Sequence, residues 1–146
     1  MATTINSIMR KQLETIKGIA SAQEAAVKMK EKNVSSLVVV DEDGKPEGIV
    51  SERDLVRKVC TSDAHVSTVK TKEIMSSPLI TITSGSSPSE AADMMLQYNV
   101  RHLLVVVNDD VNKPVGMITP LDFTRYQEYV ANEDRDAIEK MLEYYI

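Results

Sequence analysis

Two copies of a short polar motif carry the residues of this chain that are best suited to binding a small molecule. The first copy, GIVSERD, ends at Asp54, and the second, GMITPLD, ends at Asp122. Each copy places a hydroxyl side chain, Ser51 or Thr119, three residues before the carboxylate. Where such a motif begins a helix, the free backbone N–H groups attract phosphate, and the hydroxyl can donate to the same anion. The carboxylate can accept two hydrogen bonds from a vicinal diol, so the motif has the chemistry to hold a ribose and a phosphate together.

The same residues also have a purely structural interpretation. Serine or threonine at the N-cap, with an acidic residue three positions later, forms a capping box that stabilises a helix without any ligand. A single copy of the motif favours this structural interpretation. The surroundings of the two copies are therefore needed to decide between structure and ligand binding.

The chain is an internal repeat in which both copies of the motif occupy the same place. Residues 8–40 align with residues 74–106 without a gap. Residues 45–55 align with residues 113–123 after a two-residue insertion in a polar turn. Insertions of this kind are typical of surface hairpin loops. The repeat therefore predicts two similar structural halves.

Each half predicts the same order of elements, β-α-β-β-α. Helices are expected to begin at Ser21 and Ser87, because each serine is followed three residues later by a glutamate that completes a capping box. Pro88 occupies the favoured first helical position. Unbroken apolar runs predict strands that are buried on both faces. The predicted strands are 13–16, 37–40, 47–51, 79–82, 103–107 and 115–119, and the predicted second helices are 52–60 and 120–130.

Composition and charge narrow the classes of function. The 146 residues include 17 basic and 22 acidic side chains, and the net charge of −5 argues against nucleic acid as a partner. Cys60 is the single cysteine, so we expect no cysteine-based metal site. No apolar run approaches the roughly 18–20 residues of a membrane span, and we expect a cytoplasmic protein with no membrane partner. Catalytic motifs of hydrolases, metalloproteases and P-loop proteins are absent, so we expect no enzymatic activity.

The doubled element order, the apolar strand LVVV followed by DEDG, and the motif GIVSERD resemble a tandem pair of cystathionine-β-synthase (CBS) domains, also called a Bateman module. The resemblance covers about residues 5–130. It implies an α/β (α+β) fold with two β-α-β-β-α repeats packed with pseudo-twofold symmetry, plus a C-terminal helix. The implied divisions are repeat 1 over 1–66, repeat 2 over 67–130 and the helix over 131–146.

The resemblance also implies two ligand clefts, each lined by both repeats. In this family the clefts bind adenosine-containing ligands: the Ser or Thr contacts phosphate or ribose, the Asp binds the ribose hydroxyls, and adenine packs on strand residues of the other repeat. The first implied cleft is formed by Ser51, Arg53, Asp54, Ser76, Pro78, Ile80, Arg101 and His102. The second is formed by Arg10, Ile16, Ser35, Ser36, Thr119 and Asp122.

The two implied clefts differ in charge. Arg53, Arg101 and His102 make the first cleft cationic, which suits phosphate. In the second cleft, Leu121 replaces the first of these arginines and only Arg10 supplies charge. We predict AMP, ADP or ATP in the first cleft, with S-adenosylmethionine and NAD as further candidates because they share the ribose diol. The second cleft is predicted to bind an uncharged or differently charged adenosyl compound, or to stay empty. The alternative for each arginine is a solvated surface position.

Three functions remain open for the chain. The first is a nucleotide sensor that forms a homodimer, requires no cofactor and regulates an unidentified effector protein in trans. The second is a structural or interaction module with no physiological ligand. The third is nucleic-acid binding, against which the acidic charge and the absence of tryptophan argue.

The C-terminal segment predicts a further helix. Ile138, Met141, Leu142 and Tyr145 recur at helical spacing after Asn132, a predicted N-cap. This helix is expected either to fold back on its own module or to pack across a dimer interface, where tyrosine and methionine are enriched.

Overall fold

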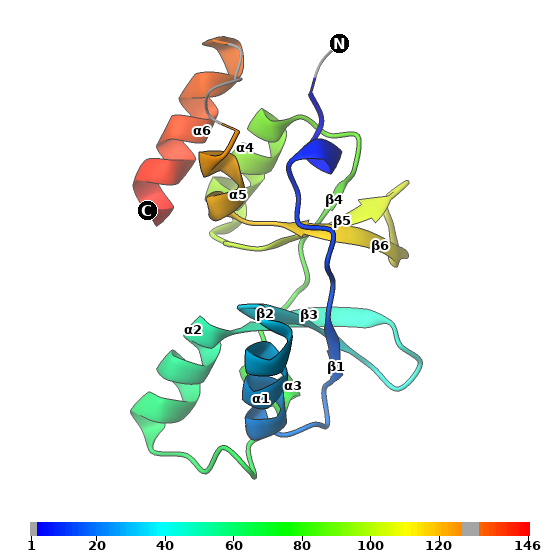
Figure 1. Cartoon of the computed structure of the whole chain (residues 1–146), viewed down its shortest axis with the longest axis vertical. Helices are drawn as coiled ribbons and strands as arrows, with labels where there is room; N and C mark the ends of the chain where they lie inside the picture. The colour runs from blue at the N-terminus through cyan, green and yellow to red at the C-terminus, as the bar shows by residue number, and fades with distance from the viewer. Residues whose placement is uncertain (1–2, 127–131) are drawn as a thin grey trace. The chain divides into compact units, whose positions relative to one another are not determined.

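The computed structural model describes residues 3–126 and 132–146 (Figure 1). The chain divides into two compact units. Unit 1 comprises residues 1–12 and 80–146, and unit 2 comprises residues 13–79. Each unit holds a three-stranded sheet with helices, so the fold is of the mixed α+β type that the repeat predicted.

Unit 2 consists of one sheet and its flanking helices. Its elements are β1 Thr15–Lys17, α1 Ala22–Lys32, β2 Ser36–Val40, β3 Pro46–Ser51, α2 Glu52–Asp54 and α3 Thr71–Ile74. β2 lies between β1 and β3, parallel to the first and antiparallel to the second. The predicted capping box begins α1: the Ser21 hydroxyl accepts from the Glu24 N–H at 3.1 Å, and the Glu24 carboxylate accepts from the Ser21 N–H at 2.7 Å.

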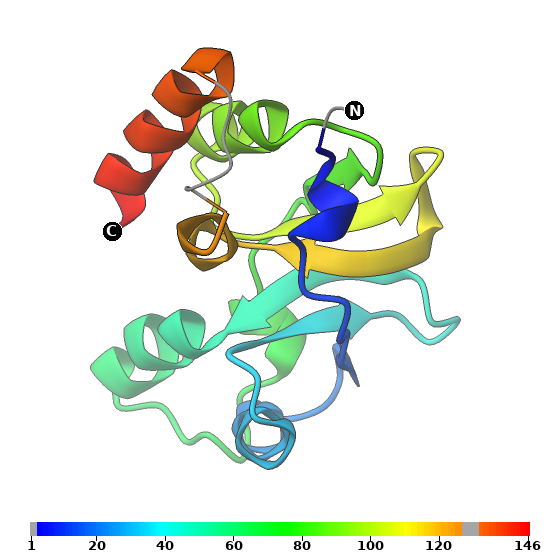
Figure 2. The same ribbon diagram turned by 45° about the horizontal axis from the view of Figure 1, so that its top comes forward.

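Unit 1 repeats this arrangement and adds the C-terminal helix (Figure 2). Its elements are β4 Thr81–Thr83, α4 Pro88–Tyr98, β5 Leu103–Val107, β6 Asp110–Ile118, α5 Pro120–Thr124 and α6 Asn132–Tyr145. β5 is the central strand, parallel to β4 and antiparallel to β6. Pro88 stands at the start of α4 as predicted, and the Ser87 hydroxyl accepts from the Glu90 N–H at 3.2 Å.

The central strand of each sheet is buried on both faces, as its unbroken apolar sequence predicted. Residues 37–40 of β2 and 103–106 of β5 are all buried. Burying each such side chain contributes about 1.5–3 kcal/mol, so these strands anchor the two sheets. β3 and β6 pair with them, with Leu37 opposite Val50 and Leu103 opposite Ile118. The two copies of the motif lie at the ends of β3 and β6.

Short segments at the start of each repeat complete the sheet of the other repeat. Arg10 exchanges two backbone hydrogen bonds with Met117 of β6, both at 2.9 Å. Ser76 exchanges two with Ile49 of β3, at 2.8 and 3.2 Å. The compact units therefore do not coincide with the sequence repeats 1–66 and 67–130.

The glycine of each motif copy makes this pairing possible. A Cβ atom at Gly48 would lie 2.9 Å from the Ser76 carbonyl oxygen and 2.6 Å from the Met75 sulfur. A Cβ atom at Gly116 would lie 2.7 Å from the Arg10 carbonyl oxygen and 2.6 Å from the Met9 sulfur. Both distances to backbone oxygen are shorter than a carbon–oxygen contact allows, so glycine is needed for the close approach of the segment.

The second helix of each half differs from its prediction. Instead of one α-helix over 52–60, α2 is followed by a π-helical turn, Leu55–Val59, and a 3-10 turn, Cys60–Ser62. Apolar spacing over so few residues does not distinguish α from π geometry. α5 ends at Thr124, and the predicted continuation over 127–130 lies outside the described residues.

The hairpin of unit 1 is tighter than the sequence suggested. Val107 pairs with Asp110, and the turn between them consists of Asn108 and Asp109, both with positive φ (52° and 58°). Two consecutive residues of this conformation form the turn that matches the twist of a hairpin, and Asn and Asp tolerate it. The two inserted residues therefore extend β6 to Asp110 rather than lengthening the loop.

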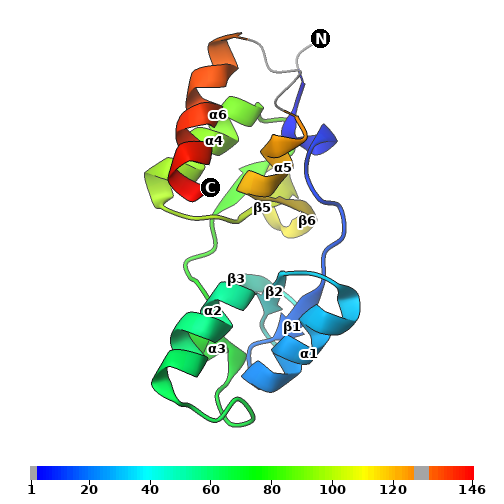
Figure 3. The same ribbon diagram turned by 60° about the vertical axis from the view of Figure 1, so that its left-hand side comes forward.

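The C-terminal helix folds back on its own unit. α6 packs along α4 and contacts α5 (Figure 3). Ile138 and Met141 are 1% and 0% exposed and belong to the core of unit 1. The first of the two predicted placements is therefore confirmed by the structure. The predicted N-cap contact of Asn132 concerns a side chain outside the described residues.

Candidate functional site

In unit 2 the motif forms a capping box where β3 meets α2. Ser51 and Asp54 are buried, each 8% exposed. The Asp54 Oδ2 atom accepts from the Ser51 N–H at 2.9 Å and from the Ser51 hydroxyl at 3.2 Å, and this hydroxyl accepts from the Asp54 N–H at 3.3 Å. The structural interpretation of the motif is therefore correct for this copy. The same contacts fix the carboxylate in one orientation.

The motif of unit 1 has nearly the same geometry. The Asp122 Oδ2 atom accepts from the Thr119 N–H at 2.9 Å and from the Thr119 hydroxyl at 3.4 Å. Asp122 is 7% exposed. One oxygen of each aspartate is thus occupied by the helix start, and the second oxygen has different surroundings in the two units.

In unit 2 the second oxygen of Asp54 has a close cation. The Lys58 ammonium lies 3.0 Å from Asp54 Oδ1 and also donates to the Ile74 carbonyl at 2.9 Å. Lys58 therefore joins the motif to α3, at the start of repeat 2. In the other repeat the aligned residue is Tyr126, which carries no positive charge.

In unit 1 the second oxygen of Asp122 is more weakly compensated. Its nearest cation is the Arg125 guanidinium at 3.6 Å, on a side chain that is 81% exposed. Burial raises the pKa of Asp122 above its ordinary value of 3.8, while the Thr119 N–H, Arg125 and Arg10 act to lower it. The surroundings of Asp122 therefore disfavour its ionised form. Two hydroxyl groups of a ligand that donate hydrogen bonds to the carboxylate would stabilise that form.

This raised pKa predicts a pH dependence that Asp122→Asn removes. The folded chain binds a proton at Asp122 more tightly than the unfolded chain, so this residue's contribution to stability falls as the pH rises from 3.8 through the raised value. The free energy of unfolding of the wild type should therefore decline, relative to Asp122→Asn, over that acid range. Urea denaturation at several pH values measures the difference.

Asp93→Asn is the matched control for that experiment, because it removes one exposed carboxylate from the same unit. Its free energy of unfolding should stay parallel to that of the wild type. The prediction is contradicted if the free energy of unfolding of the wild type rises, relative to that of Asp122→Asn, over the same pH range.

Three predicted serines of unit 2 gather around the motif. Ser36 lies opposite Ser51 in the pairing of β2 with β3. The Ser35 carbonyl accepts from the Glu52 N–H at 3.0 Å, and Ser76 bridges to β3. The structure therefore brings Ser35, Ser36 and Ser76 to the same strand end as the motif, although prediction assigned the first two to the opposite cleft.

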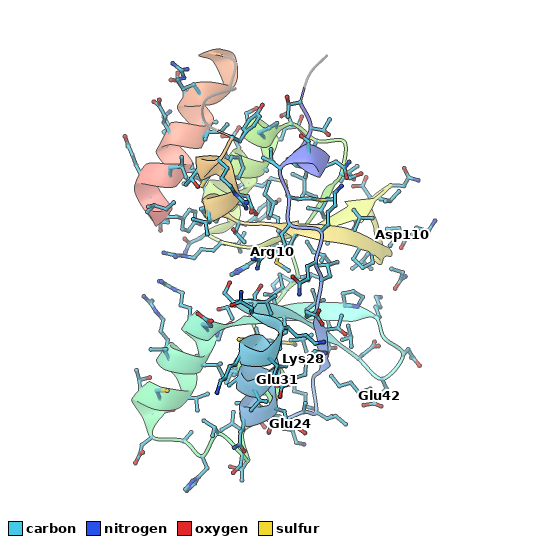
Figure 4. The ribbon with its side chains drawn as sticks, viewed as in Figure 1. Arg10, Glu24, Lys28, Glu31, Glu42 and Asp110 are labelled. Carbon is cyan, nitrogen blue, oxygen red and sulfur yellow. The ribbon has the colours of Figure 1, made fainter. Side chains whose placement is uncertain are left out.

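Three further predicted residues of unit 2 lie away from these contacts. Arg53 and Pro78 are exposed. Ile16 is half-buried on β1, where it lines a pocket of about 610 Å³ together with Glu24 and Lys28 of α1 (Figure 4). The Lys28 ammonium donates to the Thr15 carbonyl beside this pocket.

In unit 1, Arg10 lies near the motif. Its backbone pairs with Met117 of β6 (Figure 4), two residues before Thr119, and its charge acts on Asp122. Ile80 and His102 are half-buried, and the Ile80 carbonyl accepts from a β5 N–H at 3.1 Å. The combination of these residues with those of unit 2 in two clefts stays a prediction.

Arg101 has a partner that the sequence did not suggest. Its guanidinium carbon lies 5.2 Å from the ring centroid of Tyr145, at the end of α6. This cation–π contact replaces the solvated position that was the structural alternative for Arg101. Sequence reasoning missed Lys58 as well. Its signal was present, because Lys58 follows Asp54 by four residues, the spacing of ion pairs along a helix.

The sequence model of the CBS domain family matches residues 5–61 and 71–129. The chain belongs to the CBS domain family. An uncharacterized protein from Methanopyrus kandleri is 31% identical over 142 residues, which are 97% of this chain and 71% of that protein. Among the residues that the structure describes, no helix is long and apolar enough to cross a membrane.

Solved CBS structures share the fold. A CBS domain pair crystallised in complex with 5′-methylthioadenosine and S-adenosyl-L-methionine is 28% identical and covers 86% of this chain and 96% of that one, with a TM-score of 0.73. A hexameric CBS-CP12 protein from bloom-forming cyanobacteria is 26% identical and covers 96% and 78%, with a TM-score of 0.79. Family membership and these neighbours support a ligand-binding regulatory module.

Proposed function

We propose that this CBS protein is a regulatory module that binds an adenine nucleotide and acts in trans on a partner protein. The observation that carries the proposal is the buried carboxylate held at a helix start in both units, by the N–H and hydroxyl of the preceding Ser or Thr. Such a carboxylate is oriented in advance to accept hydrogen bonds from a ribose diol. A similar CBS pair with adenosine-containing ligands supports the same class of ligand for this chain.

The charges around the two motifs favour a phosphate-bearing ligand at the first site. Arg53 is exposed beside Asp54, and Lys58 adds a second cation at 3.0 Å from its carboxylate. At the second motif, Leu121 takes the place of Arg53. We therefore assign AMP, ADP or ATP to the site of Ser51, Arg53 and Asp54. An uncharged adenosyl compound is assigned to the site of Thr119 and Asp122.

The remaining parts of the proposal concern how the module works. We propose a cytoplasmic homodimer without enzymatic activity, whose effect on its partner comes from a difference in ligand affinity between two states. Nucleic acid is disfavoured by the net charge of −5. The main competing function is an interaction module with no ligand. The capping boxes favour it, because each motif carboxylate already accepts hydrogen bonds from its own helix start.

Thermal unfolding with AMP separates these two functions. A ligand at 100 times its Kd stabilises the folded protein by about 2.7 kcal/mol. For a chain of this size that stabilisation corresponds to a rise in Tm of roughly 5–10 °C. We expect such a rise with millimolar AMP and a smaller one with adenosine. An unchanged Tm with AMP, ATP and S-adenosylmethionine, together with purified protein that releases no adenosyl compound on mass spectrometry, supports the interaction module instead.

A further inference from the structure

The end of the chain holds the turn between α4 and β5 through three separate contacts. The Tyr145 hydroxyl donates to the Met95 carbonyl at 2.7 Å, and the Tyr144 hydroxyl donates to Asn99 Oδ1 at 3.1 Å. The guanidinium of Arg101 lies against the Tyr145 ring. The C-terminal tip therefore spans both sides of the turn that presents Arg101.

The contact between Arg101 and Tyr145 places the guanidinium carbon over the ring. A cation–π contact acts through the π face of the aromatic ring, whereas hydrogen bonds to phosphate use the five N–H groups of the guanidinium. Among the side chains that the structure describes, in residues 3–126 and 135–146, no hydrogen bond or ion pair of the Arg101 side chain is found. Its side chain is half-buried, so the ring restricts its position without consuming its donors.

The position of Tyr145 is itself well determined by the fold. Tyr145 packs against the core of unit 1, in the helix whose Ile138 and Met141 are buried. Its ring also makes an edge-to-face contact with Tyr144, with centroids 4.8 Å apart. An arginine side chain normally loses conformational entropy when it binds an anion. Because the Tyr145 ring already restricts Arg101, the entropy lost on binding is smaller.

We propose that Tyr145 is a positioning residue for an anionic ligand: its ring holds Arg101 in place to bind the phosphate of a nucleotide. This inference rests on the proposed function. It has a reciprocal consequence, because a phosphate that stabilises the docked Arg101 must also stabilise the docked C-terminal tip by the same free energy. The tip of α6 is therefore the part of the surface that reports the charge of the ligand. Tyr144 and Ile146 are 62% and 75% exposed there and accessible to a partner protein.

The test compares AMP with adenosine, which lacks the phosphate, in calorimetric titrations of the full chain. Tyr145→Leu keeps apolar packing but removes the π face, and we expect it to weaken AMP binding roughly 3–30-fold while leaving adenosine binding unchanged. Tyr145→Phe keeps the π face and loses only the hydroxyl bond to Met95, so it should retain the wild-type preference for AMP. Arg101→Gln should lose the preference, and adding Tyr145→Leu to it should cause no further loss.

Hydrogen exchange supplies a second measurement. AMP should slow exchange at the backbone of residues 142–146 in the wild type and in Tyr145→Phe, and adenosine should not. The inference is overturned if Tyr145→Leu binds AMP as tightly as the wild type, or if it weakens AMP and adenosine equally. Those results leave the proposed function standing, whereas a wild type that binds no nucleotide overturns both.

Discussion

Alanine at Gly116 is expected to lower the free energy of unfolding by about 1–3 kcal/mol, the usual cost of inserting a methyl group into a closely packed site. The added Cβ would lie 2.7 Å from the Arg10 carbonyl oxygen, which is a backbone atom and cannot turn away as the Met9 side chain can. The segment carrying Arg10 must then move, and its two hydrogen bonds to Met117 are strained or lost. Gly48→Ala should have a similar effect through Ser76. Chemical denaturation of each variant measures it.

Gly85→Ala is the matched control in the same unit. A Cβ atom at Gly85 meets nothing within 4 Å. Alanine there should leave stability unchanged or raise it slightly by restricting the unfolded chain. Should Gly116→Ala prove as stable as Gly85→Ala, the pairing of residues 9–10 with β6 does not contribute to the stability of unit 1.

Asp54→Ala is expected to weaken AMP binding by roughly 100-fold or more, because hydrogen bonds to a charged group contribute about 1.5–3 kcal/mol each and a ribose diol donates two. The variant also loses the carboxylate half of the Ser51 capping box and leaves Lys58 without its partner, so its stability falls as well. Binding and stability must therefore be measured separately, by calorimetric titration and by denaturation.

Glu24→Ala provides the control for the loss of the capping-box carboxylate. Glu24 has the same place in the capping box of Ser21 as Asp54 has in that of Ser51, but it lies on α1 and outside both predicted clefts. Its variant should lose similar stability and bind AMP normally. Asp122→Ala should reduce AMP binding much less than Asp54→Ala does. Equal losses in the two aspartate variants contradict the assignment of phosphate-bearing ligands to the first site.

Local features of the fold were predictable because they depend on residues close in the chain. The capping box of Ser21 and the N-terminal Pro88 need only a few neighbouring residues to be recognised. The strand around Leu104 is evident because an unbroken apolar run of that length suits a strand buried on both faces. The motif at Ser51 was likewise found at the junction of a strand and a helix, as its spacing indicated.

Contacts between distant residues were not predictable from periodicity. Nothing in the spacing of Arg101 or Tyr145 indicates that the two meet, because their contact depends on how α6 lies along α4. The bridge of Arg10 to Met117 is of the same kind, since it joins the first residues of one repeat to the last strand of the other. Leu121 led us to predict that the two motifs differ in charge. The ion pair of Lys58 with Asp54 was not part of that prediction.

The bridging segments also determine how this chain can be cut or shortened. A polypeptide that ends at residue 66 lacks Ser76 and leaves the edge of β3 unpaired at Ile49. A polypeptide that begins at residue 67 lacks Arg10 and does the same to β6 at Met117. Unpaired strand edges promote aggregation. A chain that loses one repeat therefore also loses the segment that completes the sheet of the other, and an intact unit 1 needs residues 1–12 joined to residues 80–146.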